Sequence, residues 1–437
     1  WSDFDHNKKC VSKKSSKMKK IYLCQLTVAS CLFLAACNGD KTADGKLSVI
    51  PLGTAIEKPV ELKASDYFKQ VRYVPLETTD SSLIGKGPYV QIIKDRILVS
   101  TNQSQCLMFD KGTGKFIKQV GHIGNDPEGY NSVFCWGDNE TGMIYFNGWN
   151  KDLVCYDQDG VFQRKIKIPF ETMGASSTSF GYQNDGTFVL YKSGILGDGK
   201  NNLLFFKDNM PVDSCSTMAT DEQPFDPSNI GSIAIFKSET GIELFGPTAY
   251  EGTIVIDYKE PETGCIILNA NTRLWRQDKE LYFKEAYNDT IYQIKDRTLM
   301  PSGVLDLGKY HWSFSERFMK NKDNAALITQ ILDSEDRMIV RFIRELFHKP
   351  TLYNAVITKS TGDVKVGLYA DGMKDDLTNY LPLQPMSVSQ AGEYVGLLSA
   401  ADAAEWFEDN ENKEIPQQVK ELKRIGEEDN PVVVIMK

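Results

Sequence analysis

The chain lacks the short motifs that usually identify an enzyme or a metal site. It has four histidines in 437 residues, and His122, His311 and His348 are not spaced as metal ligands are. The patterns His-Glu-x-x-His, Gly-x-Ser-x-Gly and Cys-x-x-Cys do not occur, which removes the usual zinc, serine-nucleophile and redox spacings. We therefore expect no metal and no cofactor, and the sequence favours a protein that is not an enzyme.

Positive charge is also scarce. The formal net charge is −9. Without residues 1–36, which hold seven Lys and two Asp, the balance is 43 Lys and Arg against 57 Asp and Glu, or −14. Nucleic-acid binding needs a basic surface that neutralises phosphates. We therefore expect no nucleic-acid partner.

One uncharged run lies near the N-terminus, and it is too short to cross a membrane. The first methionine, Met18, precedes Lys19, Lys20 and sixteen residues without charge, 21–36. A transmembrane helix needs about 20 apolar residues, whereas a basic start and a short apolar run are typical of a signal peptide. We expect residues 18–36 to be a lipoprotein signal peptide, and residues 1–17 to be upstream sequence translated from a misplaced start.

The run ends on Leu34-Ala35-Ala36-Cys37, which resembles the lipobox of bacterial lipoproteins. The resemblance implies that Cys37 carries lipid and anchors the protein in a membrane of the cell envelope. Asn38 is not acidic, and by similarity to known sorting rules this favours the outer membrane, with the periplasmic or surface face left open. Residues 37–67 would form a polar tether and a lead-in.

The remaining cysteines are few and leave the disulfide pairing open. An exported protein can form disulfides, but an odd number of candidates leaves at least one thiol free. Most of them stand in apolar runs, where a small buried side chain is the more common role. These cysteines are Cys106, Cys135, Cys155, Cys215 and Cys265.

From about residue 71, short apolar runs alternate with turn residues, which predicts strands paired in hairpins. One apolar residue from each hairpin gives steps of 47, 50, 86 and 65 residues, at Phe109, Tyr156, Phe206, Tyr292 and Ile357. Periods of about 40–50 residues with strand hairpins are typical of β-propeller blades. The long steps predict one hidden blade between residues 207 and 291 and one insertion at residues 309–324.

We therefore predict an all-β fold, a six-bladed β-propeller over residues 68–437 with short C-terminal helices. A β-sandwich or two smaller β-domains are the alternatives. The helices are expected at residues 400–408 and 415–425. Strands are expected near both ends of the domain, at residues 71–76 and 431–436, and we expect one of them to pair into the last blade, since propeller rings are commonly closed in this way.

Four segments carry a resemblance to a known family. They are Tyr-Val-Pro-Leu-Glu-Thr at 73–78, Gly-His-Ile-Gly-Asn-Asp-Pro-Glu-Gly-Tyr at 121–130, Tyr-Phe-Lys-Glu-Ala-Tyr-Asn-Asp-Thr-Ile-Tyr at 282–292, and Asp-Asn-Pro-Val-Val-Val at 429–434. The chain resembles the six-bladed β-propeller lipoproteins of Bacteroides-type bacteria, a domain of unknown function distantly similar to NHL-repeat propellers. In the second segment Asp126 replaces an expected Gly, and Glu128-Gly129 stand in swapped order. The resemblance implies a fold and a location.

Three motifs that superficially suggest ligand binding are better explained as turns. Residues 194–200 match a phosphate-binding loop up to Gly-Lys, but Asn201 stands where Ser or Thr is needed. Residues 157–160 resemble the start of a calcium loop without its distal Glu. Residues 184–188 faintly resemble a sialidase box that does not repeat.

The best candidate binding surface follows the first predicted hairpin and continues into the next blade. Aromatic faces beside amides are suited to sugar rings and peptides, although packing between blades is the favoured interpretation of the two tryptophans. The candidates are His122, Asn125, Asp126, Glu128, Tyr130, Trp136, Asn147, Trp149 and Asn150.

The leading hypothesis is an envelope-anchored, non-enzymatic binding or scaffolding protein that recognises a glycan, a peptide or an envelope protein. The alternative is an envelope hydrolase or lyase with a site in the propeller funnel, which three or more converging Asp, Glu, Arg or His would favour. A purely structural subunit is a third possibility.

Overall fold

The computed structural model describes residues 47–437 except 86, 102–104, 173–174, 176–178, 194–199, 221–226, 236–252, 269–272, 323 and 347–349. The described residues belong to one compact unit, Lys46–Lys437. The predicted signal peptide, Cys37 and the tether lie outside the described residues. No helix in the described part is both long and apolar enough to span a bilayer.

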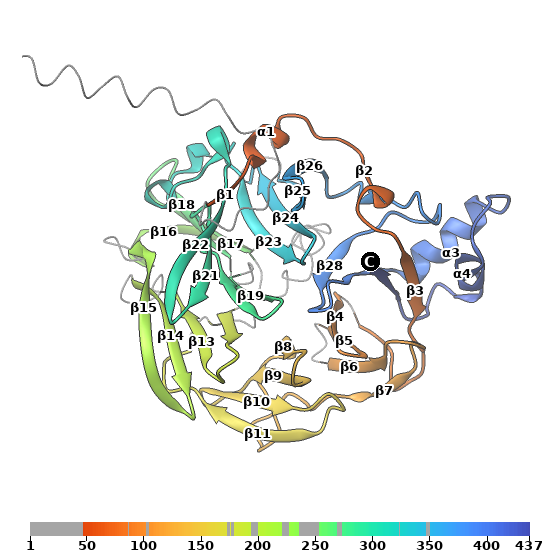
Figure 1. The fold of residues 1–437 in the computed structure, drawn as a ribbon, viewed down its shortest axis with the longest axis horizontal. Helices are drawn as coiled ribbons and strands as arrows, with labels where there is room; N and C mark the ends of the chain where they lie inside the picture. Colours follow the sequence, from red (N-terminus) through yellow and green to blue (C-terminus); the bar gives the residue numbers. More distant parts are fainter. Residues whose placement is uncertain are drawn as a thin grey trace, which may run out of the picture. The chain divides into compact units, whose positions relative to one another are not determined.

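Six sheets follow one another around a ring, and each is a blade of a β-propeller (Figure 1). Blade 1 is β4 (Tyr89–Ile93), β5 (Arg96–Thr101), β6 (Gln105–Asp110) and β7 (Phe116–Gln119). Blade 2 is β8 (Cys135–Asp138), β9 (Met143–Asn147), β10 (Asp152–Tyr156) and β11 (Phe162–Lys167). Blade 3 is β12 (Phe180–Tyr182), β13 (Phe188–Lys192), β14 (Lys200–Lys207) and β15 (Met210–Thr220).

The second half of the ring repeats this order. Blade 4 is β19 (Leu274–Gln277), β20 (Glu280–Phe283), β21 (Thr290–Lys295) and β22 (Thr298–Leu305). Blade 5 is β23 (Leu327–Asp333), β24 (Arg337–Arg344), β25 (Thr351–Thr358) and β26 (Asp363–Leu368). Blade 6 is β28 (Pro385–Val388), β29 (Tyr394–Leu398), β30 (Val432–Met436) and β3 (Val71–Pro75). The predicted six-bladed β-propeller is confirmed.

Blade 6 closes the ring with strands from both ends of the domain. β30 pairs with β29 and also with β3, where Tyr73 lies opposite Val434. Both terminal strands therefore enter the last blade, which goes beyond the prediction that one of them would. Val74 and Val433 then pack with Phe109 of blade 1 in one buried cluster. The ring is closed by noncovalent contacts between the two ends of the domain.

The blade expected between residues 207 and 291 is not there. The segment instead forms a three-stranded sheet of β16 (Ile230–Ile235), β17 (Thr253–Tyr258) and β18 (Gly264–Leu268). The innermost strands β12 and β19 contact each other directly, so blades 3 and 4 are neighbours and this sheet is an insertion. The count of six is right because the sixth blade is built by the chain ends.

The insertion predicted at residues 309–324 is confirmed. It contains three 3-10 helices, Gly308–Tyr310, Phe314–Glu316 and Lys320–Lys322. Lys320 Nζ lies 2.6 Å from an Asp257 carboxylate oxygen on β17. The Gly264 amide donates to the Phe318 carbonyl. The two insertions therefore pack on each other.

From Leu47 onward, the lead-in is part of the propeller. β1 (Ser48–Ile50) pairs in parallel with β22, and α1 (Leu52–Ile56) follows it. β2 (Leu62–Lys63) pairs in parallel with β27 (Met373–Lys374), and a 3-10 helix covers Ala64–Asp66. Leu52 and Leu62 are buried, so this segment adds core to blades 4 and 5.

The predicted C-terminal helices lie between β29 and β30. α3 (Ala400–Asp409) begins at Ser399, whose Oγ accepts the Asp402 amide as an N-cap. The second predicted helix is α4 (Gln417–Lys420) followed by a 3-10 turn, Glu421–Arg424. Pro416 stands just before α4, where its missing N–H costs nothing.

The antiparallel order of each blade defines two faces of the ring. The turns joining first to second and third to fourth strands lie on one face, which we call the hairpin face. The connections between blades and the second-to-third turns lie on the other, which we call the loop face. Long insertions and the C-terminal helices occur on the loop face, since only its connections are long.

Candidate functional site

One carboxylate organises the loop that joins β7 to β8. Asp126 Oδ1 accepts the amides of Glu128 at 3.0 Å and Gly129 at 3.1 Å. Its Oδ2 lies 2.7 Å from His122 Nε2. The hydrogen bond from His122 holds the pKa of Asp126 below its usual range. The Asp126 substitution noted in the sequence therefore builds an internally braced loop.

A second loop, between β9 and β10, lies beside the first one. Trp149 Nε1 donates to the Tyr130 carbonyl at 3.2 Å, yet 55% of Trp149 is exposed. Asn150 Nδ2 donates to Asn125 Oδ1 at 3.2 Å. The two loops are thus tied together, with an indole face open to solvent. We call this set of loop-face residues the Trp149 site: His122, Asn125, Asp126, Glu128, Trp149 and Asn150.

Three of the predicted binding residues do not join this surface. Tyr130 is 0% exposed, donates to the Val120 carbonyl at 2.7 Å and stacks on Phe146. Trp136 stacks on Tyr145 within the contact between blades 2 and 3. Asn147 is only partly exposed, in β9. Tyr130 and Trp136 are packing residues, because large apolar rings are needed to fill the space between blades.

Two lysines of β11 add hydrogen bonds to the backbone of the Trp149 site. Lys167 Nζ adds a bond to the Asn150 carbonyl at 3.2 Å, and Lys165 Nζ one to the Asp126 carbonyl at 3.0 Å. Ordering flexible side chains on binding costs affinity. Hydrogen bonds that hold the loop backbones in place reduce that cost.

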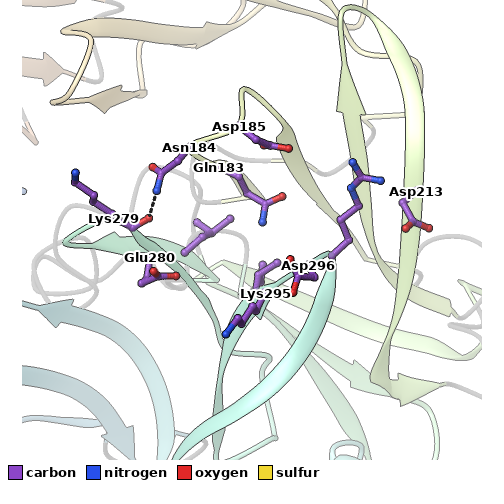
Figure 2. Close-up of a pocket in the computed structure, with 11 residues that line it drawn as sticks. Gln183, Asn184, Asp185, Asp213, Lys279, Glu280, Lys295 and Asp296 are labelled. Atoms are coloured by element: carbon purple, nitrogen blue, oxygen red, sulfur yellow. Dashed lines mark hydrogen bonds between the residues drawn. The ribbon is translucent and has the colours of Figure 1, made fainter.

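The hairpin face carries a pocket that sequence reasoning missed. It lies between blades 3 and 4 and has a volume of about 540 Å³. Figure 2 shows Asn184 of blade 3 donating to the backbone oxygen of Lys279 in blade 4. Two of its lining residues, Leu281 and Ile294, are buried and apolar, and most of the others are charged. The other lining residues are Gln183, Asp185, Asp213, Glu280, Lys295, Asp296 and Arg297.

A buried arginine lies beside this pocket and donates to Asn184, one of its lining residues. The side chain of Arg276 is 8% exposed and lies 3.6 Å from carboxylates of Asp138 and Glu140. A second pocket of about 350 Å³ shares Glu140 and Lys279. Charged groups therefore converge at the funnel, as the enzyme alternative predicts.

The carboxylates of Asp138 and Glu140 already form hydrogen bonds or ion pairs within the protein. Asp138 accepts the Glu140 amide at 2.9 Å and the Thr141 hydroxyl at 2.7 Å, both within its own turn. Glu140 lies 3.9 Å from Lys279 Nζ. An acid–base pair needs carboxyl groups placed to meet a substrate. Here they neutralise Arg276 and shape the turn.

No short motif marks this pocket, because three separate hairpin turns and one strand of two blades contribute to it. The sequence feature that could have indicated it is the set of residues typical of tight hairpin turns. Asp296 and Arg297 have φ of 47° and 62°, as a two-residue hairpin turn requires. That signal locates turns and does not show which of them are neighbours in space.

The remaining sequence motifs are turns where they can be placed. Asp157 Oδ1 accepts the amides of Asp159 and Val161 in the turn between β10 and β11. Asp185 binds Thr187 between β12 and β13. Of the phosphate-loop match, residues 194–199 lie outside the described residues. Within the part that is described, no three His, Cys, Asp or Glu are grouped to hold a metal ion.

Comparisons with known proteins agree with this architecture. No curated protein matches the chain. A solved structure from Bacteroides fragilis NCTC 9343, described as a "Putative exported protein", is 14% identical, with a TM-score of 0.56 over 89% of this chain and 99% of that chain. Identity this low shows a shared fold alone. Residues 47–437 match the family described as "Domain of unknown function (DUF4934)", and the chain belongs to that family, as its resemblance to propellers of unknown function implied.

Proposed function

We propose that the protein is a lipid-anchored binding protein of the bacterial cell envelope that holds a glycan at the Trp149 site without transforming it. Lipid on Cys37 would attach it to the outer membrane. The Leu-Ala-Ala-Cys sequence at 34–37 supports the anchor. The structurally similar Bacteroides protein described as exported supports the location.

The observation that carries this function is the exposed ring of Trp149. Large aromatic side chains are usually buried, and an indole face is apolar with a negative quadrupole. The C–H face of a pyranose ring is its natural partner. On the same two loops, Asn125, Asn150 and Glu128 carry amide and carboxylate groups that can bind sugar hydroxyls. The combination fits a neutral sugar better than a hydrophobic peptide.

The test is a glycan array followed by calorimetric titration of the oligosaccharide that binds. We expect the full-length protein to bind at least one neutral oligosaccharide. Trp149→Ala should weaken binding at least about tenfold, since buried aromatic anchors dominate such contacts. The matched control is Met210→Ala, which removes a 64% exposed side chain on the hairpin face and should leave affinity unchanged.

Three outcomes would contradict the proposal. The array could show no glycan, or Trp149→Ala could bind as tightly as the unaltered protein. Consumption of the bound glycan would replace it with the hydrolase or lyase alternative. In that case the convergence of Asp138, Glu140 and Arg276 is the first place to look, through Glu140→Gln.

A further inference from the structure

Two cysteines from neighbouring blades lie in the buried contact between blades 1 and 2. Cys106 lies on β6 and is 0% exposed, and Cys135 begins β8 and is 3% exposed. Both belong to one buried cluster with Tyr130 and Phe146. The structure holds both as thiols.

Hydrogen bonds from blade 1 set the position of Cys135. Gln91 Nε2 on β4 donates to the Cys135 carbonyl at 3.1 Å and to its Sγ at 2.9 Å. Ser100, which lies opposite Cys106 in the β5–β6 pairing, donates to the Val133 carbonyl at 2.8 Å. These hydrogen bonds hold the start of blade 2 against blade 1, next to the strand pair that contains Cys106.

The two thiols are neighbours in this buried cluster. The hydrogen bond with the Cys106 thiol, together with burial, raises the pKa of Cys135 well above its usual value. A disulfide requires sulfur atoms that can approach to bonding distance without moving the backbone far. Cys106 and Cys135 come close to meeting that requirement, because they share one buried cluster and the register partner of Cys106, Ser100, is bonded to the segment just before Cys135.

We propose that Cys106 and Cys135 form a disulfide that joins blades 1 and 2 in the exported protein. Each thiol loses one hydrogen and one S–S bond forms. The two electrons and two protons pass to the disulfide of a thiol oxidoreductase, which becomes a dithiol. Because both sulfurs are buried in the folded ring, the bond forms while the blades assemble.

The other cysteines have no such neighbour in what the structure describes. Cys155 Sγ contacts the Leu153 carbonyl of its own strand at 3.7 Å. Cys215 Sγ donates to the Ser216 carbonyl at 3.5 Å. The side chain of Cys265 lies outside the described residues. The proposal therefore selects one pair from the candidates that the sequence left open.

The bond has a consequence that rests on the proposed function. The chain between Cys106 and Cys135 contains β7 and the 121–131 loop, which supplies His122, Asn125 and Asp126 to the Trp149 site. Closing this loop covalently restricts its conformations. Reduction would then weaken glycan binding.

The experiment maps thiols in the full-length protein purified without reductant from the envelope of cells that export it. The protein is denatured, alkylated, digested and analysed by mass spectrometry. We expect peptides containing Cys106 and Cys135 to be linked to each other, and Cys155 to be alkylated. Reduction before alkylation should release the link.

Variants make the result decisive. Cys106→Ser and Cys135→Ser should each abolish the linked peptide, and the control Cys155→Ser should retain it. Complete alkylation of Cys106 and Cys135 without reductant, or a link from either to another cysteine, would overturn the proposal. Peptide mapping needs no ligand, so its outcome is independent of whether any glycan binds.

Discussion

The ring closure can be tested at one buried hydroxyl. Tyr73 on β3 is 8% exposed and donates to Asp375 Oδ2 at 2.5 Å. Burial raises the pKa of Tyr73, so its hydroxyl stays protonated and remains a donor. Thr378 Oγ1 lies 2.9 Å from the same hydroxyl. Tyr73→Phe removes this link between the closing strand and the segment before β28.

The size of the effect follows from what the variant leaves behind. A hydrogen bond to a charged group contributes about 1.5–3 kcal/mol. Asp375 keeps three donors, the Leu377 amide, the Thr378 amide and the Thr378 hydroxyl. The Phe ring preserves the edge contact with Tyr380. We therefore expect a loss of about 2 kcal/mol, or roughly 2 °C in Tm for a unit of this size.

The assay is equilibrium urea denaturation with Tyr353→Phe as the matched control. Tyr353 stacks on Phe342 in blade 5, and its hydroxyl forms no hydrogen bond with any residue that the structure describes. We expect Tyr353→Phe to change the free energy of unfolding by less than about 0.5 kcal/mol. Equal stability of the two variants would refute the reasoning that the Tyr73 hydroxyl helps to hold the ring closed.

Two further predictions concern a turn and a buried charge. Gly114 and Gly362 both stand in hairpin turns with φ near +71° and +72°, but a Cβ on Gly114 would lie 2.0 Å from the Pro75 carbonyl oxygen, whereas Gly362 has open space. In urea titrations Gly114→Ala should therefore cost at least about 1 kcal/mol more than Gly362→Ala, and equal costs would contradict the collision. Burial lowers the pKa of Lys284 from 10.5 to about 8, so the unfolded chain binds more protons between these values and the penalty for the buried charge is lost as pH rises. Lys284→Met should be more stable than the unaltered protein at pH 7, and this advantage should shrink by up to about 3 kcal/mol between pH 8 and 10.5; a pH-independent difference would argue against a charged buried Lys284.

The blade hairpins could be predicted because their information is local. Phe109, Tyr156, Phe206, Tyr292 and Ile357 each lie on the third strand of a blade, and each faces its fourth strand across a short turn. Turn residues such as Asp208 and Asn209, with φ of 50° and 64°, adopt the conformation that a tight hairpin needs. The spacing of these hairpins along the chain then predicted a β-propeller.

Spacing failed where the chain leaves this local order. The 86-residue step suggested two blades, but an inserted sheet of ordinary strand composition fills it. A strand in an insertion and a strand in a blade have the same alternation, so periodicity cannot separate them. The direct contact of β12 with β19 shows that the inserted sheet is not a blade of the ring.

Only part of the candidate site could be predicted, again because only part of it depends on residues close in sequence. The 121–130 motif correctly located His122, Asn125 and Asp126 on one loop, since they are close in sequence. Trp136 and Trp149 both belong to blade 2. Trp136 is stacked on Tyr145, whereas Trp149 is 55% exposed. Which ring is free depends on what the next blade covers.

The sequence by itself therefore determined most of the strands, the five blade hairpins and the loop that holds Asp126, because each depends on residues a few positions apart. The tertiary structure decided how the ring closes through β3 and β30, where blades 3 and 4 form a charged pocket, and that Cys106 and Cys135 belong to one buried cluster. These features depend on pairs such as Tyr73 and Val434, which are distant in the chain. Their proximity comes from packing six blades around one axis, and no local pattern encodes it.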